Sequence, residues 1–307
     1  MDRYAWFTMN KTVTLTGMEV KTHVGSNLLI QKSSLDATAI EDESGFVTDE
    51  TQSIKAVLEP VSTVDGKAFY YTLDAAADGS KIHTPVGAAS DKTVNFIAYD
   101  PSSGATDAAY GNKFSQDYGA TKEIVNAFAS GTAYADKAVG YVDYVFQLKA
   151  TNTESTDQSI NLTNLELTYK GGAPAEKAYR AAVFISPAVE AGGSFADWSS
   201  GISSGTTTNG IYTPSGAQNF SSGTAVNSTT SRGAVQYVTS GDALAVVPTG
   251  TVKYYKVVVR LWIEGEDTTC NTSTFKPLTN SWALDLEMRL GEGTAVDNIK
   301  LSSGTTN

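Results

Sequence analysis

The feature that most constrains the fold is an alternation of apolar and polar side chains with a period of two residues. Over residues 281–291 the alternating apolar side chains are Trp282, Leu284, Leu286, Met288 and Leu290. The positions between them include the charged residues Asp285, Glu287 and Arg289. Successive side chains of a β-strand point to opposite faces, so this pattern predicts a strand with one buried face.

Similar patterns recur along the chain. Residues 138–152 divide into two faces, with Val142, Tyr144, Phe146 and Leu148 on one and Asp143 and Gln147 on the other. Alternation and enrichment in β-branched and aromatic residues predict further strands at 11–24, 27–31, 54–64, 68–73, 93–99, 158–169, 178–186 and 252–267.

Helical patterns are almost absent between these segments. The best helix candidate is residues 120–130, which Gly131 follows as a plausible C-cap. A parallel α/β fold needs crossover helices, so the sequence argues against one. Charged residues make up only 18% of the chain, and glycine, serine and threonine are common, which favours strands and turns. We predict an all-β fold, an antiparallel two-sheet sandwich of jelly-roll type with at most one or two short helices.

The predicted organisation has three parts. Residues 1–24 form an N-terminal strand segment, residues 25–291 the jelly-roll domain, and residues 292–307 a flexible tail. An acidic surface loop is expected at 36–53. A long insertion rich in glycine, serine and threonine is expected at about 192–233; its scattered apolar residues can pack parts of it onto the main body.

The N-terminal segment changes phase in its middle. Val13 and Leu15 are apolar at odd positions, whereas Met18 and Val20 are apolar at even positions, and Gly17 lies between the two pairs. A change of phase across a glycine is what a β-bulge or a strand break produces. The two parts of this segment are therefore expected to belong to different pairings.

Charge and composition exclude several classes of function. The net charge is −11, and an acidic surface repels nucleic-acid phosphates and anionic lipid headgroups. The single cysteine, Cys270, cannot form an intrachain disulfide. No stretch approaches the roughly 18 apolar residues of a membrane span. The residues after Met1 do not look like a natural start, so a missing leader says nothing about export.

Catalytic patterns are also missing. The histidines are His23 and His83, and no H-E-x-x-H zinc motif occurs. Cys270 has acidic neighbours and no evident base, which does not favour a reactive thiolate. We therefore predict that the chain is not an enzyme and has no cofactor. The acidic clusters at 41–50 and 264–267 do not match an EF-hand loop and are expected to bind calcium weakly at most.

Three segments together resemble a known family. These are "YAWFTMNKTVTLTGMEV" near the start, "YVDYVFQLKATN" in the middle and "VVVRLWIEGEDTTC" near the end. The chain resembles exported Gram-positive proteins of the TasA and camelysin type, which depend on the SipW signal peptidase. The late family motif "W-I-E-G-x-D-x-x-C" matches Trp262, Ile263, Glu264, Gly265, Asp267 and Cys270. The resemblance leaves the 192–233 insertion uncovered.

This resemblance implies a jelly-roll subunit of extracellular biofilm-matrix filaments, exported through a signal peptide not present in this chain. The partners are then other copies of the chain, each donating its N-terminal strand to the next. Tyr4, Trp6, Val13 and Leu15 would enter pockets of the neighbour, and Gly17 would be the hinge between the two subunits. Residues 3–16 would then pair with a neighbouring subunit and residues 18–24 with their own.

Other functions remain open at this level. A cell-surface adhesin or carbohydrate-binding sandwich would use Trp198, Tyr212 and Phe220 to stack on glycan rings. A hydrolase would need two carboxylates in one cleft, for which Glu264, Glu266 and Asp267 are candidates. A charged turn that closes a long strand explains the same carboxylates more simply. A viral surface protein is a further alternative, which the family-like segments argue against.

Overall fold

A computed structural model gives the fold. It describes residues 13–25, 27–58, 61–63, 65–67, 69–75, 81–85, 141–170, 177–199, 201–202, 207–217, 225–227, 230–231, 237–239, 241–264, 267 and 282–304. The strands in the first half are β1 (Val13–Val24), β2 (Leu28–Lys32), β3 (Asp49–Leu58), β4 (Val61–Thr63), β5 (Phe69–Ala75), β6 (Lys81–Pro85) and β7 (Tyr141–Thr151). One 3₁₀ turn, η1 (Glu43–Gly45), lies between β2 and β3.

The second half of the chain contributes the remaining strands. They are β8 (Gln158–Lys170), β9 (Tyr179–Ile185), β10 (Thr207–Pro214), β11 (Ala225–Asn227), β12 (Thr230–Ser231), β13 (Ala245–Val247), β14 (Val252–Ile263), β15 (Trp282–Leu290) and β16 (Asn298–Gly304). The all-β prediction is confirmed.

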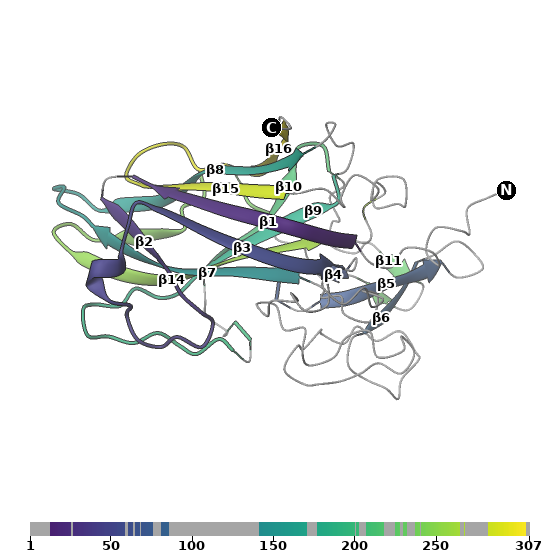
Figure 1. The fold of residues 1–307 in the computed structure, drawn as a ribbon, viewed down its shortest axis with the longest axis horizontal. Coiled ribbons are helices and arrows are strands. Elements are labelled where there is room, and N and C mark those ends of the chain that lie inside the picture. Colours follow the sequence, from purple (N-terminus) through teal and green to yellow (C-terminus); the bar gives the residue numbers. More distant parts are fainter. Residues whose placement is uncertain are drawn as a thin grey trace.

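Most strands join one large sheet that curves into a nearly closed, barrel-like wall (Figure 1). Its order is β2-β7-β14-β9-β10-β16-β8-β15-β1-β3, and β13 pairs with β8 off this path. A bridge between Ile30 and Val47 brings the two ends of the path together, because Ile30 lies in β2 and Val47 precedes β3. Two smaller sheets, β4-β5-β6 and β11-β12, lie outside this wall.

The sheet is mixed, so the expectation of a purely antiparallel sheet is wrong. Three neighbouring pairs run parallel: β1 with β15, β10 with β16, and β16 with β8. A parallel pair needs a long connection, and the described parts of these connections include other strands of the same sheet. Local patterns contain no information on such pairings, because the partners are far apart in sequence.

Most strands predicted from alternation are present within a few residues of the expected bounds. The predicted strand 54–64 starts earlier, since β3 begins at Asp49 inside the expected acidic loop. Part of the expected insertion, Thr207–Pro214, is β10 of the main sheet. The flexible tail expected from residue 292 is wrong for Asn298–Gly304, which pair as β16. The predicted strand at 93–99 and helix at 120–130 lie outside the described residues.

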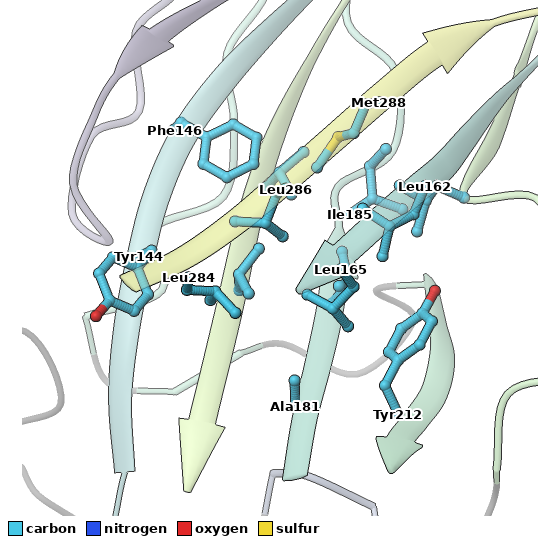
Figure 2. Close-up of a cluster of buried hydrophobic side chains, with 14 of the residues drawn as sticks. Tyr144, Phe146, Leu162, Leu165, Ala181, Ile185, Tyr212, Leu284, Leu286 and Met288 are labelled. Carbon is cyan, nitrogen blue, oxygen red and sulfur yellow. The ribbon is translucent and has the colours of Figure 1, made fainter. Parts of the chain in front are cut away.

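The main core fills the inside of the curved wall (Figure 2). β7 supplies Tyr144 and Phe146, and β15 supplies Leu284, Leu286 and Met288 from the opposite side. All five side chains are buried. The apolar set predicted for the 281–291 strand is therefore confirmed for Leu284, Leu286, Met288 and Leu290, which all belong to this core.

The outer side of β7, β14 and β9 is also buried. Two segments that we call the cover segments, residues 33–46 and 186–199, lie on it and meet through a bridge between Ala39 and Ser194. Beneath them are two further apolar clusters, which include Val145, Val258 and Trp198. Strands buried on both faces read as nearly continuous apolar runs, as β9 and β14 do.

Candidate functional site

The N-terminal strand β1 lies inside the sheet, not at its end. Its second half pairs on both sides: Glu19–Val24 run parallel to residues 283–288 of β15 and antiparallel to β3. Its first half differs, because Val13–Leu15 and Met18 pair with β3. Within the described ranges, no strand pairs with the other edge of residues 13–18.

A bulge at Gly17 separates these two halves. The register of β1 against β3 shifts between Leu15 and Met18, the interval that contains Gly17. The β-bulge expected from the phase change in the sequence is therefore present. It also marks the boundary between the doubly paired and the singly paired parts of β1.

The predicted donor residues are only partly within the described chain. Tyr4 and Trp6 lie outside it. Val13 is opposite Leu58, and Leu15 is opposite Ala56, so in this single chain both pair in cis with β3. This pairing occupies one edge of the segment, and an exchange between subunits would use the other edge.

The late family motif forms the buried end of β14 and the turn that follows it. Trp262 and Glu264 are buried, and the amide of Glu264 donates to the carbonyl of Ala178 at 2.7 Å. Asp267 accepts a hydrogen bond from the Arg180 Nη2 of β9 at 2.8 Å, and both side chains are buried. Asp267 is thus a partner of a buried ion pair, and its amide donates to the Glu264 carbonyl at 3.2 Å in the turn after β14. Gly265, Glu266 and Cys270 lie outside the described residues.

A second buried ion pair links β14 to β7. Arg260 donates from Nε to Asp143 Oδ1 at 2.7 Å and from Nη2 to Asp143 Oδ2 at 2.8 Å. The guanidinium also lies 3.8 Å from the centre of the Tyr141 ring. Burial disfavours the charge of Arg260, but Asp143 and Tyr141 outweigh this effect, and the pKa of Arg260 is raised.

Lys256 holds the two cover segments together from below. Its Nζ donates to the carbonyl of Leu35 at 3.0 Å and to that of Ala196 at 2.8 Å, one carbonyl from each segment. The ammonium also lies 5.2 Å from the centre of the Trp198 ring. Burial lowers the pKa of Lys256, and the nearby carboxylate of Asp197 opposes this shift.

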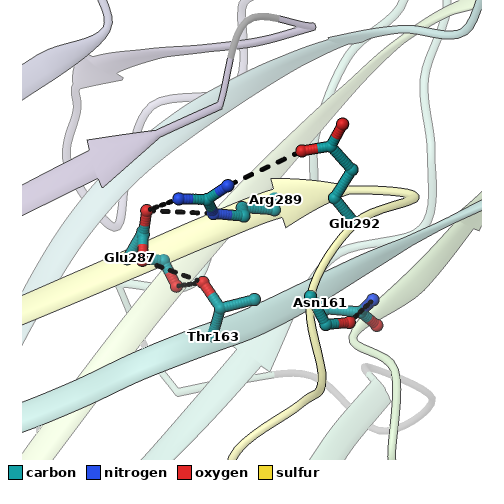
Figure 3. A network of polar contacts seen from close by, with 6 residues as sticks. Asn161, Thr163, Glu287, Arg289 and Glu292 are labelled. Atoms are coloured by element: carbon teal, nitrogen blue, oxygen red, sulfur yellow. Dashed lines mark hydrogen bonds and ion pairs between the residues drawn. The ribbon is translucent and has the colours of Figure 1, made fainter.

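The opposite side of the wall carries an open polar surface on β8 and β15 (Figure 3). Glu287 accepts from Arg289 at 2.7 Å and from Thr163 at 3.2 Å, and Arg289 also pairs with Glu292 at 3.6 Å. Arg289 and Glu287 remain 41% and 32% exposed, so these contacts are solvated. Such pairs contribute little to stability. Among the described residues, no segment covers this surface as the cover segments cover β7, β14 and β9.

Two aromatic residues considered for glycan stacking are inaccessible. Trp198 is buried above Lys256, and Tyr212 of β10 is buried in the main core. The expectation that these two rings form an exposed stacking surface is therefore wrong. Both are large apolar groups in a polar segment, and they pack inward for that reason. Phe220 lies outside the described residues.

The acidic cluster considered for calcium makes contacts within the protein. Asp42 accepts from the Ser44 amide at 2.8 Å, and Glu41 accepts from the Ser33 hydroxyl at 2.9 Å. Glu43 pairs with Lys149 and Tyr254, and these hydrogen bonds lower the pKa of Glu43. In the part of the chain that the structure describes, no group of three or more His, Cys, Asp or Glu side chains is arranged to hold a metal ion.

Some important residues were not singled out from the sequence. Asp143, Lys256 and Arg260 were expected only as members of strands, yet each is buried and forms an ion pair or bonds to several carbonyl groups. A signal existed in β14, where Lys256, Arg260 and Glu264 recur every fourth residue among β-branched residues. Charges at one face of an otherwise apolar strand indicate a face that other chain segments cover.

The comparisons with known proteins give no further assignment. No family model, no curated protein and no solved structure matches this chain. Among the described residues, no helix is long and apolar enough to cross a membrane.

Proposed function

We propose that this protein is a structural, non-catalytic subunit of an extracellular filament and assembles head to tail through its N-terminal segment. The observation that carries the proposal is the division of β1 at Gly17. After the bulge the strand has neighbours on both sides, and before it, in the described chain, β3 is its neighbour. We propose that a strand of another copy pairs with the other edge of the first half, where the described residues place no strand.

Such an edge suits strand addition. Unpaired backbone N–H and C=O groups of an extended segment form a ladder with an incoming strand, and alternate side chains enter its pockets. The twelve residues before Val13 extend this segment and contain Tyr4 and Trp6. Because donor and acceptor surfaces differ, the contact is heterologous and yields an open filament rather than a closed ring.

The same proposal includes the jelly-roll sandwich expected from the sequence. The wall is continuous, but two of its seams are narrow. β10 and β16 pair through Thr213–Asn298 and Pro214–Ile299, and β2 meets the residues before β3 at the Ile30–Val47 bridge. Two sheets that face each other and join at their corners would produce such seams. We further propose that the protein is exported and acts outside the cell.

A pair of terminal truncations tests the proposal. One variant lacks residues 2–12 and retains every described strand, and the control lacks Thr305–Asn307 at the other end. Both should keep the circular-dichroism spectrum and thermal midpoint of the full chain. Negative-stain electron microscopy and sedimentation then measure assembly. We expect filaments from the full chain and the C-terminal truncation, and only monomers from the N-terminal truncation.

Two results would overturn parts of this proposal. If the variant without residues 2–12 still forms filaments of the same appearance, the N-terminal segment is not the assembling element. If the full chain stays monomeric over a wide range of concentration and pH, so that no filaments can be prepared from it, the filament function itself is wrong.

A further inference from the structure

A tight turn after β3 lies against the outer side of β14 and β9. In this turn, the Gly66 amide donates to Thr63 Oγ1 at 2.9 Å, and the Lys67 amide donates to Asp65 Oδ1 at 2.8 Å. Gly66 has a φ of 71°, the left-handed conformation that glycine adopts without strain. Thr63 and Gly66 are both buried, so the turn is seated on the sheet rather than projecting from it.

This turn binds to the buried arginine of β14. Arg260 Nη1 donates to the carbonyl of Gly66 at 3.0 Å, while Asp143 holds the other side of the same guanidinium. The turn approaches the sheet closely, since a Cβ on Gly66 would lie 3.0 Å from the Ala182 Cβ and 3.3 Å from Phe184. We call this set of contacts the Arg260 clasp: Asp143, Arg260 and the carbonyl of Gly66.

The clasp fixes the chain close to the end of β3. β3 ends at Leu58, and β4, which contacts β14, leads into the turn. The last residues of β3 are those that pair with the first half of β1: Val13 is opposite Leu58, Thr14 opposite Val57 and Leu15 opposite Ala56. The turn bonded to Arg260 thus follows β3 closely in the sequence, and the last residues of β3 pair with the first half of β1.

We infer that the Arg260 clasp positions the N-terminal assembly segment, with Arg260 and Gly66 acting through β3 as positioning residues. This inference rests on the proposed function for its consequence in assembly, but its structural part does not. Among the described residues β3 is the neighbour of Val13–Leu15, and a strand with one neighbour frays unless it is anchored. Of the three charge-assisted hydrogen bonds, two fix Arg260 against Asp143 of β7, and the third, to the Gly66 carbonyl, anchors the turn.

The test substitutes one glycine and compares it with a matched one. Gly66→Ala adds a methyl group in a left-handed position where Ala182 and Phe184 obstruct it. Gly192→Ala adds the same group at a φ of 81° with nothing within 4 Å, so it reproduces the backbone strain without displacing the turn. Thr63→Val is a second, milder variant, because it removes the hydroxyl that accepts from the Gly66 amide.

Hydrogen exchange measured by mass spectrometry on the monomer is the first readout. We expect Gly66→Ala and Thr63→Val to raise exchange in residues 13–18 and 49–58 by about tenfold relative to Gly192→Ala. Exchange in β14 and β15 should stay unchanged. A general loss of stability would raise exchange in all strands together. If exchange rises only in residues 61–75, or equally in all strands, the clasp does not position the segment.

Filament elongation from preformed seeds is the second readout. Monomers with Gly66→Ala should elongate wild-type seeds about tenfold more slowly than monomers with Gly192→Ala, as expected for a segment that is ordered only part of the time. Equal elongation rates would overturn the inference while leaving the filament function intact. If the wild type forms no filaments, the proposed function fails, and the exchange experiment alone decides whether β3 couples the clasp to β1.

Discussion

The buried pair between Asp143 and Arg260 allows a sharp test of how this fold is stabilised. Asp143→Ala removes both hydrogen-bond acceptors of the carboxylate, at 2.7 and 2.8 Å, from a guanidinium whose side chain is only 4% exposed. The arginine cannot reach water without displacing the turn at Gly66. Removing one partner of a buried ion pair costs about 3–5 kcal/mol, since the other charge stays buried and unpaired. We expect Asp143→Ala to lower the free energy of unfolding by this amount.

A control ion pair and a double variant test whether the loss comes from leaving Arg260 buried without its carboxylate. Glu166→Ala removes the partner of Lys300, which is 66% exposed, and should cost less than about 1 kcal/mol. The double variant Asp143→Leu with Arg260→Met replaces both charges by apolar groups. This double variant should lose less free energy of unfolding than Asp143→Ala, because apolar replacement of a buried ion pair is often close to neutral.

Urea unfolding followed by tryptophan fluorescence measures these free energies, with the slope of the transition checked for each variant. A double-mutant cycle that adds the single variants Asp143→Leu and Arg260→Met gives the coupling between the two residues. If Asp143→Ala costs no more than Glu166→Ala, the guanidinium is not desolvated as its burial indicates. The reasoning from burial to stability would then be refuted for this site.

Further predictions follow from other buried groups. Burial raises the pKa of Tyr255 to about 12 and also raises that of Tyr144, while unfolded tyrosines ionise near pH 10. The two buried phenols therefore stabilise the folded protein fully below pH 10, and this stabilisation is lost as the pH rises toward 12. Urea unfolding at pH 8 to 11.5 should show a falling free energy of unfolding. Tyr255→Phe should make this fall smaller. Lys256→Met removes the ammonium that donates to the Leu35 and Ala196 carbonyls, although the Leu35 carbonyl keeps the Trp198 amide as a donor. The substitution should lower the free energy of unfolding by about 1–3 kcal/mol, with faster proteolysis in residues 33–46 than for the exposed control Lys300→Met. Truncation after residue 297 removes β16 and should lower the thermal midpoint measured by calorimetry. Truncation after residue 304 is the control and should leave the midpoint unchanged. An unchanged midpoint without β16 would show that this strand is dispensable for stability.

Strands with one buried face could be predicted closely from the sequence. The alternation at 281–291 corresponds to β15 at Trp282–Leu290, because Leu284, Leu286, Met288 and Leu290 all pack into the same core. β16 was missed, since only Ile299 and Leu301 alternate in it, and two residues do not establish a period. The parallel partners of β1 and β16 are set by tertiary packing, which no local pattern expresses.

The candidate site shows the same division between local and tertiary information. The bulge at Gly17 followed from a phase change within eight residues, a local property. The buried state of Asp143 and Arg260 did not, because alternation assigns both to a polar face and cannot reveal that other segments cover it. The sequence did contain one indication of the buried ion pair, which is the occurrence of opposite charges on two strongly apolar strands. Its meaning depends on the neighbouring strands, which the structure supplies.

The position of β1 has a consequence for the order in which the protein folds. β1 is synthesised long before β15, yet Val20 of β1 lies opposite Leu284 of β15. Contacts between residues so far apart in sequence form slowly. Until β15 is complete, the apolar N-terminal strand has a vacant side throughout its length, and another chain at high concentration competes for it. Chaperones and the timing of chain release would then influence which chain it pairs with first, its own or a neighbour.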